Sequence, residues 1–293
     1  MNIGFIGLGH MGLPMAGRLA ASGAPLTVWN RTPGKAAPLV TAGATLAESP
    51  RALAASSDVV ITMLADAAAV RSVLAGDGGV LAACRDGAVV MDMSTIGPRA
   101  ARDLAAEAAR HGSSFLDVPV SGSTALAATG TLTALAGGSP GAFERVRPVL
   151  AELSQRQLYL GPSGSGAAMK LAVNIIIAAT NQSVAEALAL AEESGIDRAR
   201  AYETLTASAV ASPFISYKRE AFLHPGEGPV SFTTALMKKD LELAMEVAGQ
   251  VPLPVTAAAR DFLGTACEAG LADADFASVI QVLRPAPEGQ PSQ

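Results

Sequence analysis

The stretch Ile3-Gly4-Phe5-Ile6-Gly7-Leu8-Gly9-His10-Met11-Gly12 decides the fold of the first half of the chain. A short apolar run typical of a buried strand leads into a Gly-x-Gly-x-x-Gly loop, and a helical stretch follows it. Gly7 permits a tight turn, Gly9 lets the backbone approach a phosphate, and Gly12 lets the helix pack on the strand. The pattern predicts a pyrophosphate-binding turn with contacts from Gly7, Leu8, Gly9, His10, Met11 and Gly12. The alternative is a glycine-rich turn without a ligand.

Strands and helices alternate through the first half of the sequence. Apolar, β-branched runs predict strands at residues 2–6, 26–29, 59–63, 88–92, 114–117 and 131–136. Ala-rich stretches predict helices at residues 11–21, 36–42, 67–74, 98–111 and 142–152. This order predicts right-handed βαβ units in an α/β, Rossmann-type doubly wound parallel sheet. We assign residues 1–162 to this dinucleotide-binding domain.

The alternation stops at Gly161-Pro162-Ser163-Gly164-Ser165-Gly166. Residues 167–194 then form a long apolar stretch that predicts a helix of ~42 Å at ~1.5 Å per residue. Further helices are predicted at residues 199–208, 234–249 and 255–269. The sequence therefore predicts an all-α domain over residues 163–283, built on the long central helix. Residues 284–293 are rich in Pro, Gly and Gln and are predicted to be disordered.

Composition excludes several classes of function. The net charge is −5 without a basic run, which argues against a nucleic acid partner. Polar residues within 171–191 argue against a membrane span. The two cysteines, Cys84 and Cys267, form no CxxC and the three histidines lie far apart, so we expect no metal. Reduced thiols are typical of a cytoplasmic protein, which is the predicted location.

The end of the second strand indicates which dinucleotide is bound. Many NAD-binding proteins place Asp or Glu there to bond the ribose 2′-hydroxyl. This chain has Asn30-Arg31-Thr32 instead, and a guanidinium beside a hydroxyl suits a 2′-phosphate. The predicted cofactor is therefore NADP, with NAD possible and with Asn30, Arg31 and Thr32 as contacts. The alternative is that Arg31 is a solvated surface residue and that either cofactor is used.

Two further loops belong to the predicted cofactor side. Met63 ends the strand at residues 59–63 and Leu64 follows it, and Thr95 follows the strand at residues 88–92. Ligands of doubly wound sheets lie beyond the carboxyl ends of the strands, where these residues are expected.

A lysine interrupts the apolar surface of the long helix. Lys170, Asn174 and Asn181 are spaced i, i+4 and i+11, which places them on one face. Because the rest of the helix is apolar almost all round, we expect it to be buried and its polar stripe to meet polar groups. Burial disfavours an ammonium and would lower its pKa toward the range of general acid–base catalysis. The alternative is a lysine that reaches solvent from a helix end.

Four motifs together resemble the β-hydroxyacid dehydrogenase family, which includes 3-hydroxyisobutyrate dehydrogenase and glyoxylate/succinic semialdehyde reductase. The first is the glycine segment at residues 4–16. The second is Asp117-Val118-Pro119-Val120-Ser121-Gly122-Ser123, with Gly130-Thr131-Leu132 and Gly137-Gly138 after it. The third is Gly164-Ser165-Gly166-Ala167-Ala168-Met169-Lys170 with Asn174, and the fourth is Lys239-Asp240-Leu241.

The resemblance implies an NAD(P)-dependent oxidoreductase that interconverts a small β- or γ-hydroxy acid and its semialdehyde. It implies that Lys170 is the general acid/base and that Asn174 helps to hold the substrate. The substrate carboxylate would be bound by Ser121, Gly122 and Ser123. Thr95, Phe232 and Lys239 would contact the cofactor. The implied assembly is a homodimer or homotetramer formed through the helical domain.

The sequence departs from the family pattern at Val173, where many relatives carry Asn, so the identity of the substrate stays open. Asn30-Arg31-Thr32 and Ser121-Gly122-Ser123 look more like the glyoxylate/succinic semialdehyde reductase branch. An imine reductase shares the architecture but usually has another residue in place of Lys170. A non-catalytic NADP-binding scaffold lacks that lysine. Chain length and Val173 argue against a 6-phosphogluconate dehydrogenase.

Overall fold

The computed structural model describes residues 1–283 and forms two compact units, divided after Leu171. Helix α8 (Ser165–Glu193) begins in the first unit and continues into the second. The predicted domain boundary at residues 162/163 stays a prediction, and the predicted disorder of residues 284–293 lies outside the described residues. An α/β Rossmann-type unit followed by a helical unit is the predicted fold class, which the structure confirms.

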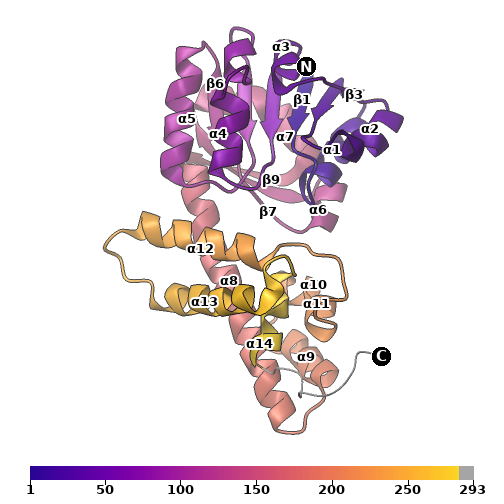
Figure 1. Cartoon of the computed structure of the whole chain (residues 1–293), viewed down its shortest axis with the longest axis vertical. Coiled ribbons are helices and arrows are strands. Elements are labelled where there is room, and N and C mark those ends of the chain that lie inside the picture. Colours follow the sequence, from indigo (N-terminus) through magenta and orange to yellow (C-terminus); the bar gives the residue numbers. More distant parts are fainter. Residues whose placement is uncertain (284–293) are drawn as a thin grey trace. The chain divides into compact units, whose positions relative to one another are not determined.

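The first unit is built on one sheet (Figure 1). Its strands are β1 (Ile3–Ile6), β2 (Leu26–Trp29), β3 (Thr45–Leu46), β4 (Val59–Thr62), β5 (Val89–Asp92), β6 (Ser114–Asp117), β7 (Val120–Ser121), β8 (Leu132–Gly138) and β9 (Ser154–Gly161). The order is β3-β2-β1-β4-β5-β6-β8-β7, with β9 paired to β8. The pairings from β3 to β6 are all parallel, and β8 runs antiparallel to β6 and β7.

Helices cover both faces of this sheet. They are α1 (Gly12–Ala21), α2 (Ala37–Thr41), α3 (Pro50–Ala55), α4 (Ala67–Ala75), α5 (Pro98–Arg110), α6 (Thr124–Thr129) and α7 (Pro140–Leu153). One core joins α1, α6 and α7 to the sheet, and a second core joins α3, α4 and α5 to its opposite face. Since both faces are buried, the central strands are apolar runs rather than alternating ones, with polar residues only at their ends, Thr62 in β4 and Asp92 in β5.

The strand register fixes one edge of the sheet as the place for a site. Ile6 pairs with Thr62, Thr62 with Asp92, and Asp92 with Asp117, so β1, β4, β5 and β6 end side by side. Within the first unit, the loops that carry the predicted cofactor residues begin at this edge.

Several elements of this unit were not predicted from the sequence. The longest is β9, with the sequence Ser-Gln-Arg-Gln-Leu-Tyr-Leu-Gly. It pairs with β8 alone and is mostly exposed, so neither an apolar run nor a clean alternation marks it. The two-residue strands β3 and β7 and the six-residue helices α3 and α6 are too short for their periodicity to be seen.

The second unit is helical within the described residues. After α8 it contains α9 (Arg198–Ala207), α10 (Pro213–Tyr217), α11 (Arg219–Leu223), α12 (Thr234–Ala248), α13 (Pro254–Ala266) and α14 (Ile280–Leu283). Its core gathers large side chains from several helices and from the turn at Phe276–Val279. Tyr202, Phe222 and Phe276 are its largest fully buried members.

The expectation that α8 is buried all round is wrong for one face. Ile175 and Ile177 pack on the helical core, but Ile176 between them is 68% exposed and Leu190 is 70% exposed. Within residues 1–283, one helix is long and apolar enough to cross a membrane, and this helix is α8. Core helices of soluble proteins meet the same criterion. Its Asn174 and Asn181 are each 2% exposed and hydrogen-bonded, which marks α8 as the central helix of this unit.

Candidate active site

The glycine loop has the geometry that a pyrophosphate requires. Gly7 has φ +99°, and a Cβ there would lie 2.8 Å from a methyl carbon of Leu64. A Cβ on Gly12 would collide with the carbonyl oxygen of Gly7, so the first turn of α1 is pressed against the strand end. A Cβ on Gly9, in contrast, would meet nothing within 4 Å. The loop is therefore tight at both ends and open at its middle, which fits close approach of a phosphate.

Asn30 holds this loop in place. The backbone N–H of Leu8 donates to Asn30 Oδ1 at 2.9 Å, and Asn30 Nδ2 donates to the carbonyl of Thr32 at 2.9 Å. Its side chain thus joins the glycine loop to the segment after β2. Arg31 and Thr32 are exposed beside it, where they are accessible to a ligand.

A buried carboxylate joins the two other cofactor-side loops. Asp92 Oδ1 accepts hydrogen bonds from Thr62 Oγ1 at 2.7 Å and from Ser94 Oγ at 2.6 Å, and the Ser94 hydroxyl oxygen accepts from Leu64 N–H at 2.9 Å. The pKa of Asp92 is raised to about 6, mainly by burial with a small contribution from nearby Asp117, against the lowering effect of these hydroxyl donors. Asp92 thereby fixes the starts of the loops that contain Leu64 and Thr95.

The predicted carboxylate-binding loop follows β6. Ser121 belongs to β7 and pairs with Thr133 of β8. Gly122 has φ +143°, and a Cβ there would lie 2.7 Å from a methyl carbon of Leu132, so a larger residue is excluded. Ser123 Oγ accepts from the N–H of Leu126 at 3.3 Å and caps α6. The loop is thus held at both ends, with Gly122 exposed between them.

Lys170 lies just beyond the start of α8, and Asp117 anchors that start. Asp117 Oδ1 accepts from Gly164 N–H at 2.8 Å, and its Oδ2 accepts from Ala167 N–H at 2.8 Å. Lys170 is half-buried, one turn after Ala167. Burial raises the pKa of Asp117, while backbone N–H groups, led by that of Gly164, act to lower it.

Asn174 and Lys239 meet on one carboxylate in the helical unit. Asp240, fully buried on α12, accepts a 2.6 Å hydrogen bond from Asn174 Nδ2 at Oδ2. Lys239 Nζ lies 3.0 Å from Asp240 Oδ1. Asp240 therefore holds the Asn174 amide by a hydrogen bond and forms an ion pair with Lys239.

Phe232 is held by another buried ion pair of the same unit. Lys218 Nζ lies 2.6 Å from Asp275 Oδ1, with side-chain exposures of 2% and 8%. Asp275 Oδ2 also accepts from Ser231 N–H at 3.0 Å, and Phe276 N–H donates to the carbonyl of Phe232 at 3.0 Å. The Phe232 and Phe276 rings pack edge to face with centroids 5.9 Å apart.

The predicted site residues therefore fall into two sets. The glycine loop, Asn30, Arg31, Thr32, Met63, Leu64, Thr95, Ser121, Gly122, Ser123 and Lys170 belong to the first unit. Asn174, Phe232 and Lys239 belong to the second. The sequence interpretation assigned no role to Asp92, Asp117 or Asp240. The sequence did contain a signal for them. Asp92 and Asp117 each end an apolar strand, and Asp240 lies within the apolar stripe of α12 formed by Met237, Leu241 and Ala244.

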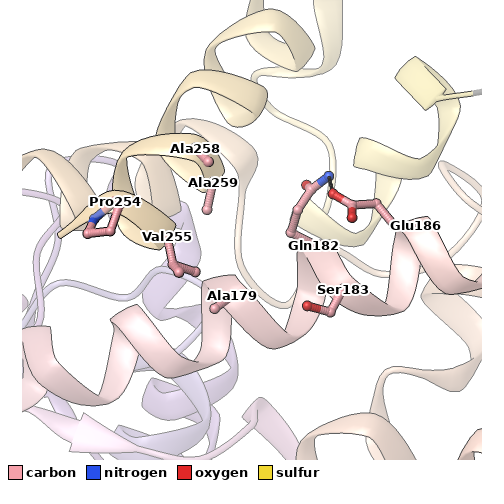
Figure 2. Close-up of a pocket in the computed structure, with 8 residues that line it drawn as sticks. All are labelled: Ala179, Gln182, Ser183, Glu186, Pro254, Val255, Ala258 and Ala259. Atoms are coloured by element: carbon pink, nitrogen blue, oxygen red, sulfur yellow. Dashed lines mark hydrogen bonds between the residues drawn. The ribbon is translucent and has the colours of Figure 1, made fainter.

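The helical unit also contains a surface pocket of about 350 Å³ between α8 and α13 (Figure 2). Ala179, Ser183 and Val255 line it, and Gln182 Nε2 donates to Glu186 Oε1 at 2.9 Å on its wall. Its lining includes none of the predicted catalytic residues. Within residues 1–283, no group of three or more His, Cys, Asp or Glu side chains is placed to hold a metal ion.

Two family models together match nearly the whole chain. The NAD binding domain of 6-phosphogluconate dehydrogenase matches residues 2–161. A second model, described as NAD-binding of NADP-dependent 3-hydroxyisobutyrate dehydrogenase, matches residues 164–283. The chain thus carries an NAD(P)-binding domain, as the glycine loop predicted.

Individual relatives agree with these models. The chain is 37% identical to 2-(hydroxymethyl)glutarate dehydrogenase of Eubacterium barkeri, over 96% of this chain and 94% of that protein. It is 35% identical to glyoxylate/succinic semialdehyde reductase 1 of Arabidopsis thaliana, over 97% and 99%. Its structure is similar to that of 3-hydroxyisobutyrate dehydrogenase from Salmonella typhimurium, with a TM-score of 0.90 and 30% identity over 96% and 99%.

Proposed function

This chain belongs to the β-hydroxyacid dehydrogenase family, and on that premise we propose that it interconverts a small β- or γ-hydroxy acid and its semialdehyde. The reaction is NAD(P)-dependent and acts at a CH–OH group, which the matched family model for NADP-dependent 3-hydroxyisobutyrate dehydrogenase supports. When bound, the nicotinamide ring supplies or accepts the hydride.

One observation carries this proposal. The carboxylate of Asp117 ties the start of α8 to the end of β6, at the edge of the sheet where the glycine loop and the Thr95 loop also begin. Lys170 therefore belongs to the same unit as the cofactor loops and the Ser121–Gly122 turn. A proton donor, an anion-binding turn and a dinucleotide cradle are the parts that reduction of an aldehyde acid requires.

Each residue has a role that its surroundings support. Lys170 donates a proton to the oxygen that becomes the alcohol in reduction, and accepts that proton in oxidation. The Ser121 hydroxyl and the backbone around Gly122 bind the substrate carboxylate. Asn174, whose amide is oriented by Asp240, holds the substrate hydroxyl end. Lys239, on the same carboxylate, and Phe232 contact the cofactor.

A substrate screen tests this function. NADPH consumption is followed at 340 nm with glyoxylate, succinic semialdehyde, methylmalonate semialdehyde, tartronate semialdehyde and a cyclic imine. We expect turnover of at least one of the aldehyde acids and none of the imine. Turnover of the imine alone would favour an imine reductase, and the absence of any turnover would contradict the proposal.

We also propose that NADP is preferred over NAD, because Arg31 and Thr32 are exposed beyond β2 and no carboxylate stands there. Arg31→Ala is expected to raise KM for NADPH ~10-fold, the loss of roughly one charge-assisted contact. KM for NADH should change less than ~2-fold, since NADH lacks the 2′-phosphate. Arg156→Ala, on the exposed strand β9, is the matched control. A wild-type enzyme with a lower KM for NADH than for NADPH would contradict the assignment.

We also propose that this chain forms a dimer or tetramer through the helical unit. Ile176 and Leu190 lie fourteen residues apart on the exposed face of α8, and Val255 at the adjacent pocket is 62% exposed (Figure 2). Apolar side chains concentrated in this way are typical of surfaces buried by assembly.

Ile176→Glu should therefore shift the mass measured by light scattering from an oligomer to a single chain, because a charge would be buried without a partner. Val210→Glu, at a position 58% exposed in the same unit, is the control and should leave the oligomer intact. A wild-type protein that elutes as a monomer at micromolar concentration would refute the interface.

We also propose a cytoplasmic location, which the two free cysteines support.

A further inference from the structure

Asp117 joins two parts of the proposed site, but the proposed reaction gives its side chain no role of its own. It is the last residue of β6 and is 1% exposed. Each carboxylate oxygen accepts a hydrogen bond from a different N–H of the segment that begins α8, Gly164 and Ala167, both at 2.8 Å. A carboxylate that caps a helix 47 residues away in sequence is a tertiary anchor, unlike the local Ser and Asp caps elsewhere in the chain.

Close backbone packing reinforces this anchor. A Cβ on Gly137 would lie 2.8 Å from both carboxylate oxygens of Asp117 and 2.8 Å from the Gly166 nitrogen. A Cβ on Gly166 would collide with the carbonyl oxygen of Leu135 and would lie close to that of Asp117. Glycine at both positions therefore lets the start of α8 lie directly on β6 and β8. The contact leaves no room for the helix start to move toward the sheet.

Asp117 is connected to two groups of the proposed chemistry, to one along the chain and to the other through its hydrogen bond with Ala167. Ser121 follows four residues later, through a segment fixed by the bond from Val118 N–H to the Asp92 carbonyl at 2.7 Å and by the pairing of β7 with β8. Lys170 follows Ala167, the residue whose N–H Asp117 binds, by three positions on α8. The carboxylate-binding turn and the proton donor are thus both tied to one side chain by short, rigid paths.

We propose that Asp117 is a positioning residue, which sets the separation between the Ser121–Gly122 turn and Lys170. This inference rests on the proposed function of those two groups. Proton transfer to a substrate held at its carboxylate requires that separation to be correct, and a displacement of ~1 Å lowers rates ~100-fold in comparable cases. Asp117 itself makes no contact with substrate in this proposal and acts through Lys170.

The test combines exchange, kinetics and a double variant. Asp117→Asn keeps one acceptor oxygen and leaves one N–H of the helix start without its partner. Amide exchange in residues 164–170 of the cofactor-free protein should accelerate ~10-fold. With an accepted aldehyde, kcat should fall ~30-fold and KM for NADPH should stay within ~2-fold. In a Lys170→Ala background the same substitution should lower kcat less than ~2-fold, because its effect passes through Lys170.

Two controls separate positioning from general loss of stability. Asp103→Asn removes an exposed carboxylate of α5 and should change neither exchange nor kcat. Val146→Ala weakens the core of the same unit and should lower Tm without the loss of kcat at 25 °C. Wild-type kcat in Asp117→Asn, or an equal loss in both backgrounds, would overturn the inference. A wild-type protein that is inactive on every aldehyde acid would overturn the proposed function instead. In that case, unchanged amide exchange in residues 164–170 of Asp117→Asn would still show that Asp117 does not anchor the start of α8.

Discussion

Replacement of Lys170 by alanine is expected to lower kcat ~1,000-fold and to leave the Kd for NADPH within ~2-fold of wild type. A positioned general acid or base contributes ~10²–10⁴-fold to the reaction rate. Lys170 is the residue to which we assign that role among the described residues 1–283. Binding of NADPH is measured by fluorescence titration without substrate. Steady-state turnover uses the best aldehyde acid from the screen.

A second substitution separates proton transfer from charge. Lys170→Arg retains the positive charge, but a guanidinium does not release its proton near neutral pH. Its kcat should therefore stay within ~10-fold of the alanine variant. Lys238→Ala, a lysine of α12 paired with Glu242, serves as control and should keep wild-type turnover. Near-normal kcat in Lys170→Ala would remove the lysine from the mechanism, and near-normal kcat in Lys170→Arg would assign it a purely electrostatic role.

Local pattern was enough to predict the part of the fold that binds the dinucleotide. The glycine spacing predicts a sharp turn, and Gly7 and Gly12 indeed leave no space for a Cβ. The apolar runs that became β1, β4 and β5 are buried on both faces, so their composition alone identifies them. In such segments the local preference and the tertiary environment agree.

The sequence could not show interactions that depend on tertiary partners. Asn30 was predicted as a cofactor contact, which stays a prediction, and the structure adds that its side-chain oxygen accepts from Leu8 N–H in the glycine loop. Asp240 stood next to Lys239 in a recognised motif, yet its hydrogen bond to Asn174 joins residues 66 positions apart. The exposed face of α8 around Ile176 was equally hidden, since an apolar sequence does not reveal whether its partner is the same chain or another.

The burial of Asp92 also depends on its tertiary partners, and it leads to a measurable prediction about how stability depends on pH. We expect the stability advantage of wild type over Asp92→Asn to fall by ~2 kcal/mol as the pH rises from about 4 to about 7. Burial raises the pKa of Asp92 from its ordinary range to about 6 in the folded protein. Between about pH 4 and pH 6 the folded state therefore holds a proton that the unfolded state has released.

Stability from this group is thus fully present below about pH 4 and is lost as the pH rises through about 6, because deprotonation then places a charge in a site that excludes water. Asparagine keeps the acceptor oxygen for Thr62 and Ser94 and does not titrate, so its own contribution is constant with pH. The free energies of unfolding of both proteins are measured by urea denaturation across this range. Asp103→Asn, an exposed carboxylate, should give a difference from wild type that changes by less than ~0.5 kcal/mol. A wild-type advantage that stays constant, or that grows with pH, would mean that Asp92 is ionised throughout and that its hydroxyl donors outweigh its burial.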